Sequence, residues 1–203
     1  MKTIFIPAKS KVNYDIDLPK NLPKQIALAY SIQYEDLAKK IKEKLSKNHA
    51  VYNIGQVLGC SKPKFSKTQA ILLISDGRFH AINLALTTNL PIYILDKGKI
   101  HLIPKEETEN LKNMKKASYV NFLNSNKAGI LISTKPGQEN LKKAIEIKNK
   151  LKIKYKDKKS YLFISNNINI NEFENFSDIQ SWINTACPRL DMNSNKIVNA
   201  DKL

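Results

Sequence analysis

Short apolar runs alternate with polar, lysine-rich stretches along most of the chain. The runs are rich in Ile, Val, Leu and Tyr, which is typical of strands buried in a sheet. They predict strands at residues 3–7, 25–32, 51–55, 70–75, 91–95, 99–103, 128–133, 160–165 and 181–185.

Between these runs, apolar residues recur at helical spacing. Leu37, Ile41 and Leu45 lie four residues apart with lysines on the opposite face, and they predict a helix over 34–46. Further helices are predicted at residues 80–88, 106–124 and 138–152. Because strands alternate with helices, we expect an α/β fold with mostly parallel sheets.

The same pattern predicts two consecutive small α/β domains. Acidic residues at 106–109 suit the start of a helix that bridges them. We therefore expect one domain over residues 1–105, a bridging helix over 106–127 and a second domain over 128–203. The polar tail after Leu190 is expected to be frayed.

Composition narrows the class of protein. Of the 203 residues, 42% are hydrophobic, so the chain can bury a core and we do not expect wholesale disorder. No apolar run approaches the roughly 18 residues of a transmembrane helix. The apolar stretch at the N-terminus is too short for a signal peptide. With Cys60 and Cys187 as its only cysteines, the chain is no disulfide scaffold, and we expect it in the cytoplasm.

The formal net charge of +16 would ordinarily indicate nucleic-acid binding. However, Arg78 and Arg189 are the only arginines among the 34 basic residues, and Asn and Ile are abundant. This composition is typical of a genome poor in G and C, where lysine is the default cation on a solvated surface. We therefore expect no dedicated nucleic-acid role, and we keep a basic RNA-binding α/β protein as an alternative.

The two arginines carry more information than the lysines. Lysine cannot reproduce the planar guanidinium fork that binds a carboxylate through two hydrogen bonds. Arg78 and Arg189 therefore point to positions that need this fork. Chance retention or a bidentate salt bridge would explain them as well.

Four motif-like strings follow predicted strands directly. Because the carboxyl ends of parallel strands share one edge of a sheet, residues in such strings can gather into a site. The strings are LGCSKP (58–63), SDGRFH (75–80), STKPGQ (133–138) and TACPRL (185–190).

Two of these strings suggest an anion or proton-handling site. In STKPGQ, Pro136 suits a helix start and Lys135 adds charge, so the turn is either an anion site or an ordinary capped turn. In SDGRFH, Arg78 can bind a carboxylate and His80 can bind metal or move a proton. An ion pair of Arg78 with Asp76 beside a packed histidine is the simpler alternative.

Cys60 and Cys187 leave two interpretations open. Lone cysteines are usually buried core residues. Both, however, follow strand ends beside Gly59 or Pro188, where a core residue is less expected. There is no CxxC motif and no zinc-like spacing with histidine, so a metal site split between the two cysteines is the alternative.

Taken together, four strings in this order and spacing resemble archaeal diphthamide synthase. They are VLGC (57–60), DGRFH (76–80), STKPGQ (133–138) and NTACPRL (184–190). That family comprises the radical S-adenosylmethionine (SAM) enzyme 2-(3-amino-3-carboxypropyl)histidine synthase, of the first step of diphthamide biosynthesis. Residues 24–34 are similar to the opening of the family's middle domain, so the resemblance covers nearly the whole chain.

The resemblance implies a specific transferase chemistry. Family members have three similar α/β domains, each offering one cysteine to a [4Fe-4S] cluster whose fourth iron is open to SAM. The reduced cluster cleaves the Cγ–S bond of SAM. The 3-amino-3-carboxypropyl group is then added to C2 of a histidine in translation elongation factor 2. Archaeal members act as homodimers.

The resemblance also implies roles for individual residues. Cys60 corresponds to the cluster ligand of the middle domain and Cys187 to that of the last domain. Residues expected around the cluster and SAM are Gln33, Asp76, Arg78, His80, Ser133, Lys135, Gln138 and Arg189. No residue is assigned a catalytic role of its own.

The chain departs from the family in one major respect, because the N-terminal domain and its cysteine have no counterpart. In addition, Ser75 stands where the family usually has glycine. We expect a separate chain to supply the missing domain and the third cysteine, in a homodimer or a heterotetramer. A fragment of a longer protein is one alternative. Another is a non-catalytic paralogue that acts as a scaffold for the synthase or for elongation factor 2. The retained arginines favour a subunit or a fragment.

Overall fold

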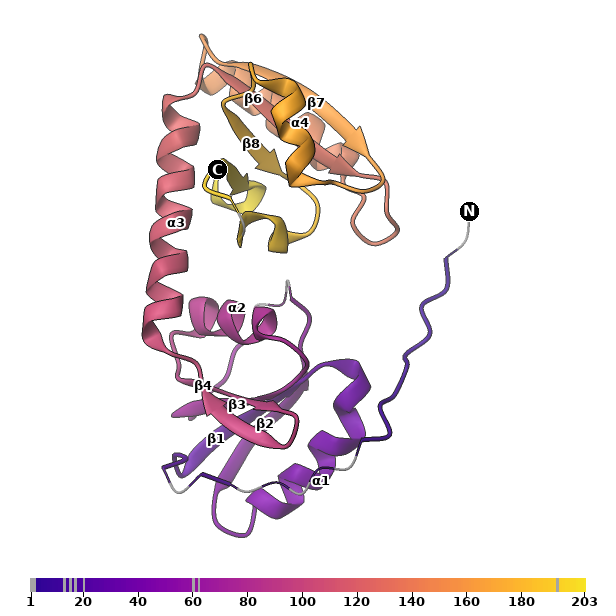
Figure 1. The fold of residues 1–203 in the computed structure, drawn as a ribbon, viewed down its shortest axis with the longest axis vertical. Coiled ribbons are helices and arrows are strands. Elements are labelled where there is room, and N and C mark those ends of the chain that lie inside the picture. The colour runs from indigo at the N-terminus through magenta and orange to yellow at the C-terminus, as the bar shows by residue number, and fades with distance from the viewer. Residues whose placement is uncertain are drawn as a thin grey trace. The chain divides into compact units, whose positions relative to one another are not determined.

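The chain folds into two compact units, which are described separately. The computed structural model describes residues 3–12, 14, 16, 18–19, 21–59, 61, 63–192 and 194–203. Unit 1 is Met1–Thr108 and unit 2 is Glu109–Leu203, and the division falls in the first turn of helix α3 (Lys105–Asn124). Figure 1 colours the chain from its N-terminus to its C-terminus.

Unit 1 is built on one sheet with the strand order β2-β1-β3-β4-β5. Its strands are β1 (Gln25–Tyr30), β2 (Ala50–Gln56), β3 (Ala70–Ile74), β4 (Ile92–Asp96) and β5 (Lys99–Leu102). The first four run parallel, whereas β5 pairs antiparallel with β4. The carboxyl ends of β1, β2 and β3 therefore meet at one edge of this sheet.

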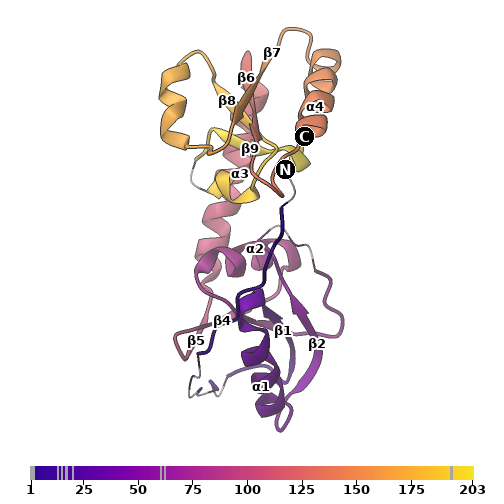
Figure 2. The ribbon, with the colours of Figure 1, turned by 90° about the vertical axis from the view of Figure 1, so that its right-hand side faces the viewer.

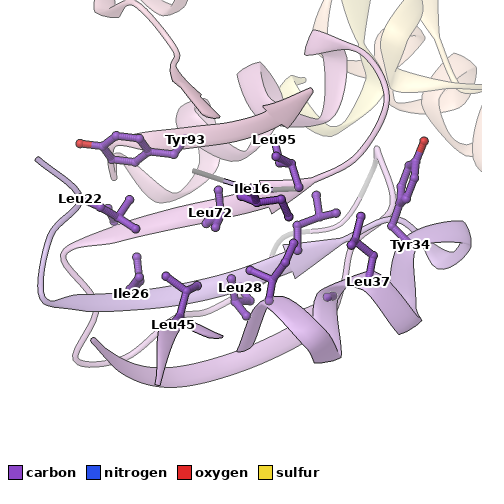
Figure 3. Packing of buried hydrophobic residues seen from close by; sticks show 14 residues of the cluster. Ile16, Leu22, Ile26, Leu28, Tyr34, Leu37, Leu45, Leu72, Tyr93 and Leu95 are labelled. Carbon is purple, nitrogen blue, oxygen red and sulfur yellow. The ribbon is translucent and has the colours of Figure 1, made fainter. Parts of the chain in front are cut away.

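Helices cover the two faces of this sheet. They are α1 (Glu35–Leu45), α2 (Arg78–Thr88) and the short 3-10 helix η1 (Ile32–Tyr34) that precedes α1. Because side chains alternate along a strand, Leu28 packs in a core with Leu37 of α1, and its neighbour Ala29 packs in a second core with Leu84 of α2. Figure 3 shows the first of these cores.

Unit 2 is built on a parallel sheet with the strand order β7-β6-β8-β9. Its strands are β6 (Lys127–Ser133), β7 (Lys159–Ser165), β8 (Ser181–Asn184) and β9 (Ile197–Asn199). Its other elements are α4 (Leu141–Lys154) and the 3-10 helices η2 (Ile170–Phe176), η3 (Pro188–Met192) and η4 (Ala200–Lys202). Figure 2 shows α4 and η2 on opposite sides of this sheet.

The two faces of the second sheet are packed differently. On one face, Phe122 of α3 and Ile147 of α4 are buried against β6 and β8. On the other, Trp182 is 1% exposed and stacks on Phe173 of η2, with ring centroids 4.1 Å apart. A Cβ at Gly129 would lie 2.5 Å from the Trp182 ring, so this strand position needs glycine.

The expected α/β class with mostly parallel sheets is confirmed. Two predictions about the end segments of the chain are wrong. Residues 3–7 form no strand, although their pattern is that of one, and their side chains are exposed. The tail after Leu190 is not frayed, because η3, β9 and η4 lie within it and Ile197 and Val198 are buried. Among the described residues, no helix has the length and apolar character to cross a membrane.

Candidate functional site

A pocket of about 340 Å³ opens in unit 2 at the carboxyl ends of its strands. Three segments line it: the turn after β6, the loop after β7 and the loop that joins β8 to η3. The lining residues are Ser133, Lys135, Gln138, Asn166, Ile168, Cys187, Arg189 and Leu190. The pocket thus gathers the unit 2 residues singled out from the sequence together with Leu190, the last residue of the TACPRL string. It adds Asn166 and Ile168, which carried no motif signal.

The turn after β6 presents Lys135 and Gln138 to this pocket. The Lys135 backbone N–H donates to the Ser133 hydroxyl at 3.1 Å, and the Gln138 N–H donates to the Lys135 carbonyl at 3.0 Å. Gly137 has a φ of 78°, which favours glycine. Contrary to the expectation for Pro136, α4 begins only at Leu141, so this proline lies in a turn ahead of the helix.

Buried side-chain amides hold the loop that carries Cys187. The Asn184 side chain accepts from the Ala186 N–H at 2.9 Å and donates to the Cys187 carbonyl at 2.8 Å. The amide of Asn199 donates to the Pro188 carbonyl at 3.2 Å. Cys187 itself is half-buried at the pocket wall. Its position is therefore fixed through its backbone on both sides.

The same amides continue into a buried carboxylate. Asn184 donates to Asn199 at 2.6 Å, and Asn199 donates to Asp191 at 2.6 Å. Lys115 of α3 donates to the same Asp191 oxygen at 2.8 Å. Burial raises the pKa of Asp191, and the Lys115 ammonium opposes this shift. We call Asn184, Asn199, Asp191 and Lys115 the loop network.

Sequence reasoning missed the loop network. Asn184 stands within the NTACPRL string and could have been noticed there. Asn199 lies in the tail taken as frayed, and Lys115 is one of many lysines. These partners are distant in sequence, so no local pattern pairs them.

The unit 1 candidates lie after β1 and β3 of its sheet. Gln33 is in η1, and Asp76, Arg78 and His80 follow β3. Tyr34 is buried; burial first, and its interaction with the Asp76 carboxylate second, raise the pKa of the Tyr34 hydroxyl. Figure 3 includes Tyr34.

Arg78 and His80 each lie against a polar side chain of unit 1. The Arg78 guanidinium pairs with Glu107 at 2.5 Å rather than with Asp76, so the Asp76–Arg78 ion pair does not form. The His80 Nδ1 lies 3.3 Å from the Ser75 hydroxyl. Ser75 is thus a further polar residue at this edge.

The segment that leads to Cys60 is closely packed at Gly59. A Cβ at Gly59 would lie 2.0 Å from the Phe79 ring, and Asn83 donates to the Gly59 carbonyl at 2.9 Å. Gly59 thus cannot carry a side chain without displacing Phe79. Cys60 itself lies outside the described residues.

Fold and site together define a class of protein. It is an α/β protein with mostly parallel sheets, in which one cysteine and two basic side chains line a pocket at the carboxyl ends of strands. The family model described as "Putative diphthamide synthesis protein" matches residues 1–196. The chain therefore belongs to the diphthamide synthesis protein family.

Known proteins similar to this chain agree with that membership. The 2-(3-amino-3-carboxypropyl)histidine synthase of Pyrococcus horikoshii is 27% identical over 208 residues, covering 93% of this chain and 59% of the relative. Subunit 1 of the Schizosaccharomyces pombe synthase is 31% identical over 140 residues, covering 67% of this chain and 32% of the relative.

A solved structure shares the fold. The crystal structure of Dph2 from Pyrococcus horikoshii with a 4Fe-4S cluster matches with a TM-score of 0.73 and 24% identity, covering 89% of this chain and 56% of that one. The chain thus spans between a third and three fifths of the length of these relatives.

Proposed function

We propose that this chain is a cytoplasmic subunit of a diphthamide synthase. It would transfer the 3-amino-3-carboxypropyl group of SAM to C2 of a histidine of translation elongation factor 2. The observation that carries the proposal is the unit 2 pocket, because it combines Cys187 with the cations Lys135 and Arg189. Family membership and the names of the relatives support it.

The residues of the pocket fit one corner of a [4Fe-4S] cluster. Cys187 supplies a thiolate, and the nearby cations offset the negative charge of a thiolate-ligated cluster. Cys60 supplies a second thiolate from unit 1. Among the described residues no group of three His, Cys, Asp or Glu side chains could hold a metal ion. A cubane normally takes three or four protein ligands, so a third cysteine is needed, and a separate chain is the source that we propose for it.

The same pocket suits the amino acid end of SAM. The Arg189 guanidinium forms two parallel hydrogen bonds to the SAM carboxylate, and the Lys135 ammonium adds a third donor. Gln138 binds the α-amino group, while Ser133 orients the turn through the Lys135 N–H. Ile168 and Leu190 exclude water from one wall.

Unit 1 corresponds to the middle domain of the family and unit 2 to the last one. Gln33, Asp76, Arg78 and His80 then contribute to the SAM and substrate side from unit 1. His80 and the Tyr34–Asp76 pair are groups there that can hold a proton.

The reaction is balanced without a further co-substrate. When bound, a reduced cluster would supply the electron for reductive cleavage of the Cγ–S bond of SAM, with 5′-methylthioadenosine as the leaving group. The 3-amino-3-carboxypropyl group would bond to C2 of the imidazole, the proton of that carbon would pass to solvent, and its surplus electron would return to the oxidised cluster. Donors fixed in the pocket hold the transferred group by its carboxylate throughout.

The experiment reconstitutes the complex anaerobically with its partner chain, SAM and elongation factor 2. Released 5′-methylthioadenosine and the mass of the modified factor are measured. Cys187→Ser and Cys60→Ser should each abolish both products. If either variant keeps wild-type product formation, the proposed ligand role of that cysteine is wrong.

A matched pair of lysine variants tests the pocket. Lys135→Met and Lys150→Met each remove one positive charge, but Lys150 is exposed on α4. Loss of a hydrogen bond to a charged group costs about 1.5–3 kcal/mol, so Lys135→Met should raise the KM for SAM at least about tenfold. Lys150→Met should leave KM unchanged. If the two variants changed the KM for SAM equally, Lys135 would contribute only to the overall positive charge and would not bind SAM directly.

A purely scaffolding role would give the opposite pattern. The partner or elongation factor 2 would bind, and neither cysteine variant would change that binding. SAM would not be cleaved by any preparation. That result would reject the transferase proposal.

A further inference from the structure

Residues 3–7, Thr-Ile-Phe-Ile-Pro, form an exposed apolar segment without a sheet. Ile4, Phe5 and Ile6 are 84%, 75% and 84% exposed. No backbone hydrogen bond joins them to the residues that the structure describes. Three consecutive large apolar side chains in water are rare unless they form an interaction site.

The segment shares a short motif with the strand that ends the sheet of unit 1. Residues 100–104 read Ile-His-Leu-Ile-Pro, so Phe5, Ile6 and Pro7 correspond to Leu102, Ile103 and Pro104. In both places the Ile-Pro pair stands near one end of unit 1, which spans Met1–Thr108. Proline is tolerated there because an edge strand needs no further N–H donor.

The two copies of the motif have opposite environments. Leu102 pairs with Tyr93 of β4, the Ile103 N–H donates to the Ile92 carbonyl at 2.9 Å, and Ile103 is 5% exposed. Its counterpart Ile6 is 84% exposed. Residues 3–7 thus have the sequence of an edge strand but lack the parallel strand on which such an edge forms.

We infer that residues 3–7 form the edge strand of a sheet in a partner α/β chain, antiparallel to the last parallel strand of that sheet. The orientation follows from the pairing of β5 with β4. Addition of a strand satisfies the backbone donors and buries one row of side chains at once. That the partner is the chain with the third cluster cysteine rests on the proposed function.

The lengths of the relatives support a partner of this kind. The Pyrococcus horikoshii synthase has two fifths of its length without a counterpart here, because this chain covers 59% of it. Both units of this chain are α/β sheets of one general plan. A further unit of that plan, carried by the partner, would supply the sheet that residues 3–7 lack.

The base of the segment is anchored beside the unit 1 candidates. The Ser10 N–H donates to the Gln33 carbonyl at 2.8 Å, and the Lys9 ammonium pairs with Asp36 at 3.1 Å. The three residue steps from Pro7 to Ser10 span at most about 10 Å. A sheet paired with residues 3–7 is therefore held close to Gln33, at the edge where β1 and β3 end.

Amide hydrogen exchange of residues 3–6 tests the inference. It compares the isolated chain with the purified complex whose partner has been identified by mass spectrometry. By the pattern of β5, in which the Ile103 N–H is bonded, the amides of Ile4 and Ile6 should slow on the order of 100-fold. Those of Thr3 and Phe5 face away from the partner strand and should stay fast.

A matched pair of variants measures the contribution to assembly. Ile6→Asp and Ile153→Asp both replace an apolar side chain that is exposed in this chain, at 84% and 80%. Neither should alter folding of the isolated chain. Ile6→Asp should weaken partner binding roughly 10- to 100-fold, because one buried apolar side chain is lost. Ile153→Asp should leave binding unchanged.

The outcomes separate this inference from the proposed function. Unprotected amides at residues 3–6 in a complex that cleaves SAM would overturn the strand inference and leave the proposed function standing. Alternating protection in a complex that holds no iron would support the strand inference and overturn the proposed function. Protection that arises in a dimer of this chain alone, or equal effects of the two aspartate variants, would overturn the assignment of a partner sheet.

Discussion

Units 1 and 2 have the same plan but differ in how they hold their polar residues. In unit 2, the loop network fixes the backbone around Cys187 and a pocket forms beside it. In unit 1, the candidates form local pairs, Arg78 with Glu107 and His80 with Ser75. A cysteine held by buried amides is preorganised for a ligand, whereas the exposed Arg78–Glu107 pair can be exchanged for a partner or substrate at little cost.

The ends of the two sheets differ as well. Unit 1 ends in the antiparallel strand β5, and unit 2 ends in the three-residue parallel strand β9. β9 brings Asn199 into contact with Asn184 and Asp191. The last strand of unit 2 thus serves the cysteine loop, whereas the last strand of unit 1 is mostly exposed and carries none of the candidate site residues.

The largest expected effect comes from a core substitution made in one unit at a time. Trp182→Ala should lower the free energy of unfolding of unit 2 by about 3–5 kcal/mol, and Leu72→Ala that of unit 1 by about 2–5 kcal/mol, because both side chains are fully buried. Hydrogen exchange, resolved by strand, measures each unit. Each variant should speed exchange in its own sheet alone. Equal changes in both sheets would mean that the units unfold as one.

A smaller effect is expected within the loop network. Asn184→Ala leaves buried partners unsatisfied and should lower the unfolding free energy of unit 2 by about 1–3 kcal/mol. It should also speed alkylation of Cys187 by iodoacetamide, read by peptide mass spectrometry. The control Asn175→Ala removes a hydrogen bond to Glu172 on the surface and should change neither quantity. Unchanged alkylation in Asn184→Ala would show that the network does not hold the loop.

Arg189 should bind SAM through the planar shape of its guanidinium group as well as through its charge. Arg189→Lys keeps the charge but removes the planar fork, so the KM for SAM should rise about tenfold, equivalent to about 1.4 kcal/mol. Steady-state release of 5′-methylthioadenosine by the complex measures this effect. If lysine serves equally well, the argument from retained arginines fails at this position.

The smallest effect is a pH dependence with opposite signs at two carboxyl groups. Burial raises the pKa of Asp191 above its ordinary value of 3.8, so the native state binds a proton more tightly than the unfolded chain. Stability should therefore fall as pH rises from about 4 through the raised pKa. Lys127 lowers the pKa of the exposed Asp178, whose contribution is present above 3.8 and is lost as pH falls through the lowered pKa.

Urea unfolding between pH 3 and pH 7 measures both contributions. Asp191→Asn should remove the falling component of the profile, and Asp178→Asn should remove a weaker rising one. Parallel profiles for the wild type and Asp191→Asn would contradict the direction given for Asp191.

Most secondary structure could be predicted because its signal is local. The spacing of Leu37, Ile41 and Leu45 marks the buried face of α1, and residues 70–74 are a fully buried strand. The prediction for residues 3–7 failed because a strand needs a neighbouring strand, which the local pattern cannot supply. Strand β9 was not predicted because three residues in a polar tail give too short a pattern.

The site was predictable to the extent that strand ends determine it. The rule that carboxyl ends of parallel strands share an edge brought Lys135, Cys187 and Arg189 into one pocket. The loop network was not predictable, because hydrogen bonds between Lys115, Asp191 and Asn199 leave no periodic trace. The pairing of Arg78 with Glu107, which lies 29 residues further along the chain, was missed for the same reason.

Iron analysis of the anaerobically purified complex tests the central claim most directly. Iron and acid-labile sulfide are measured for the wild type and for Cys187→Ala, with the partner chain quantified in both. The account predicts about four irons per complex in the wild type and nearly none in Cys187→Ala, with the partner still bound. Four irons and an unchanged visible spectrum in Cys187→Ala would contradict it.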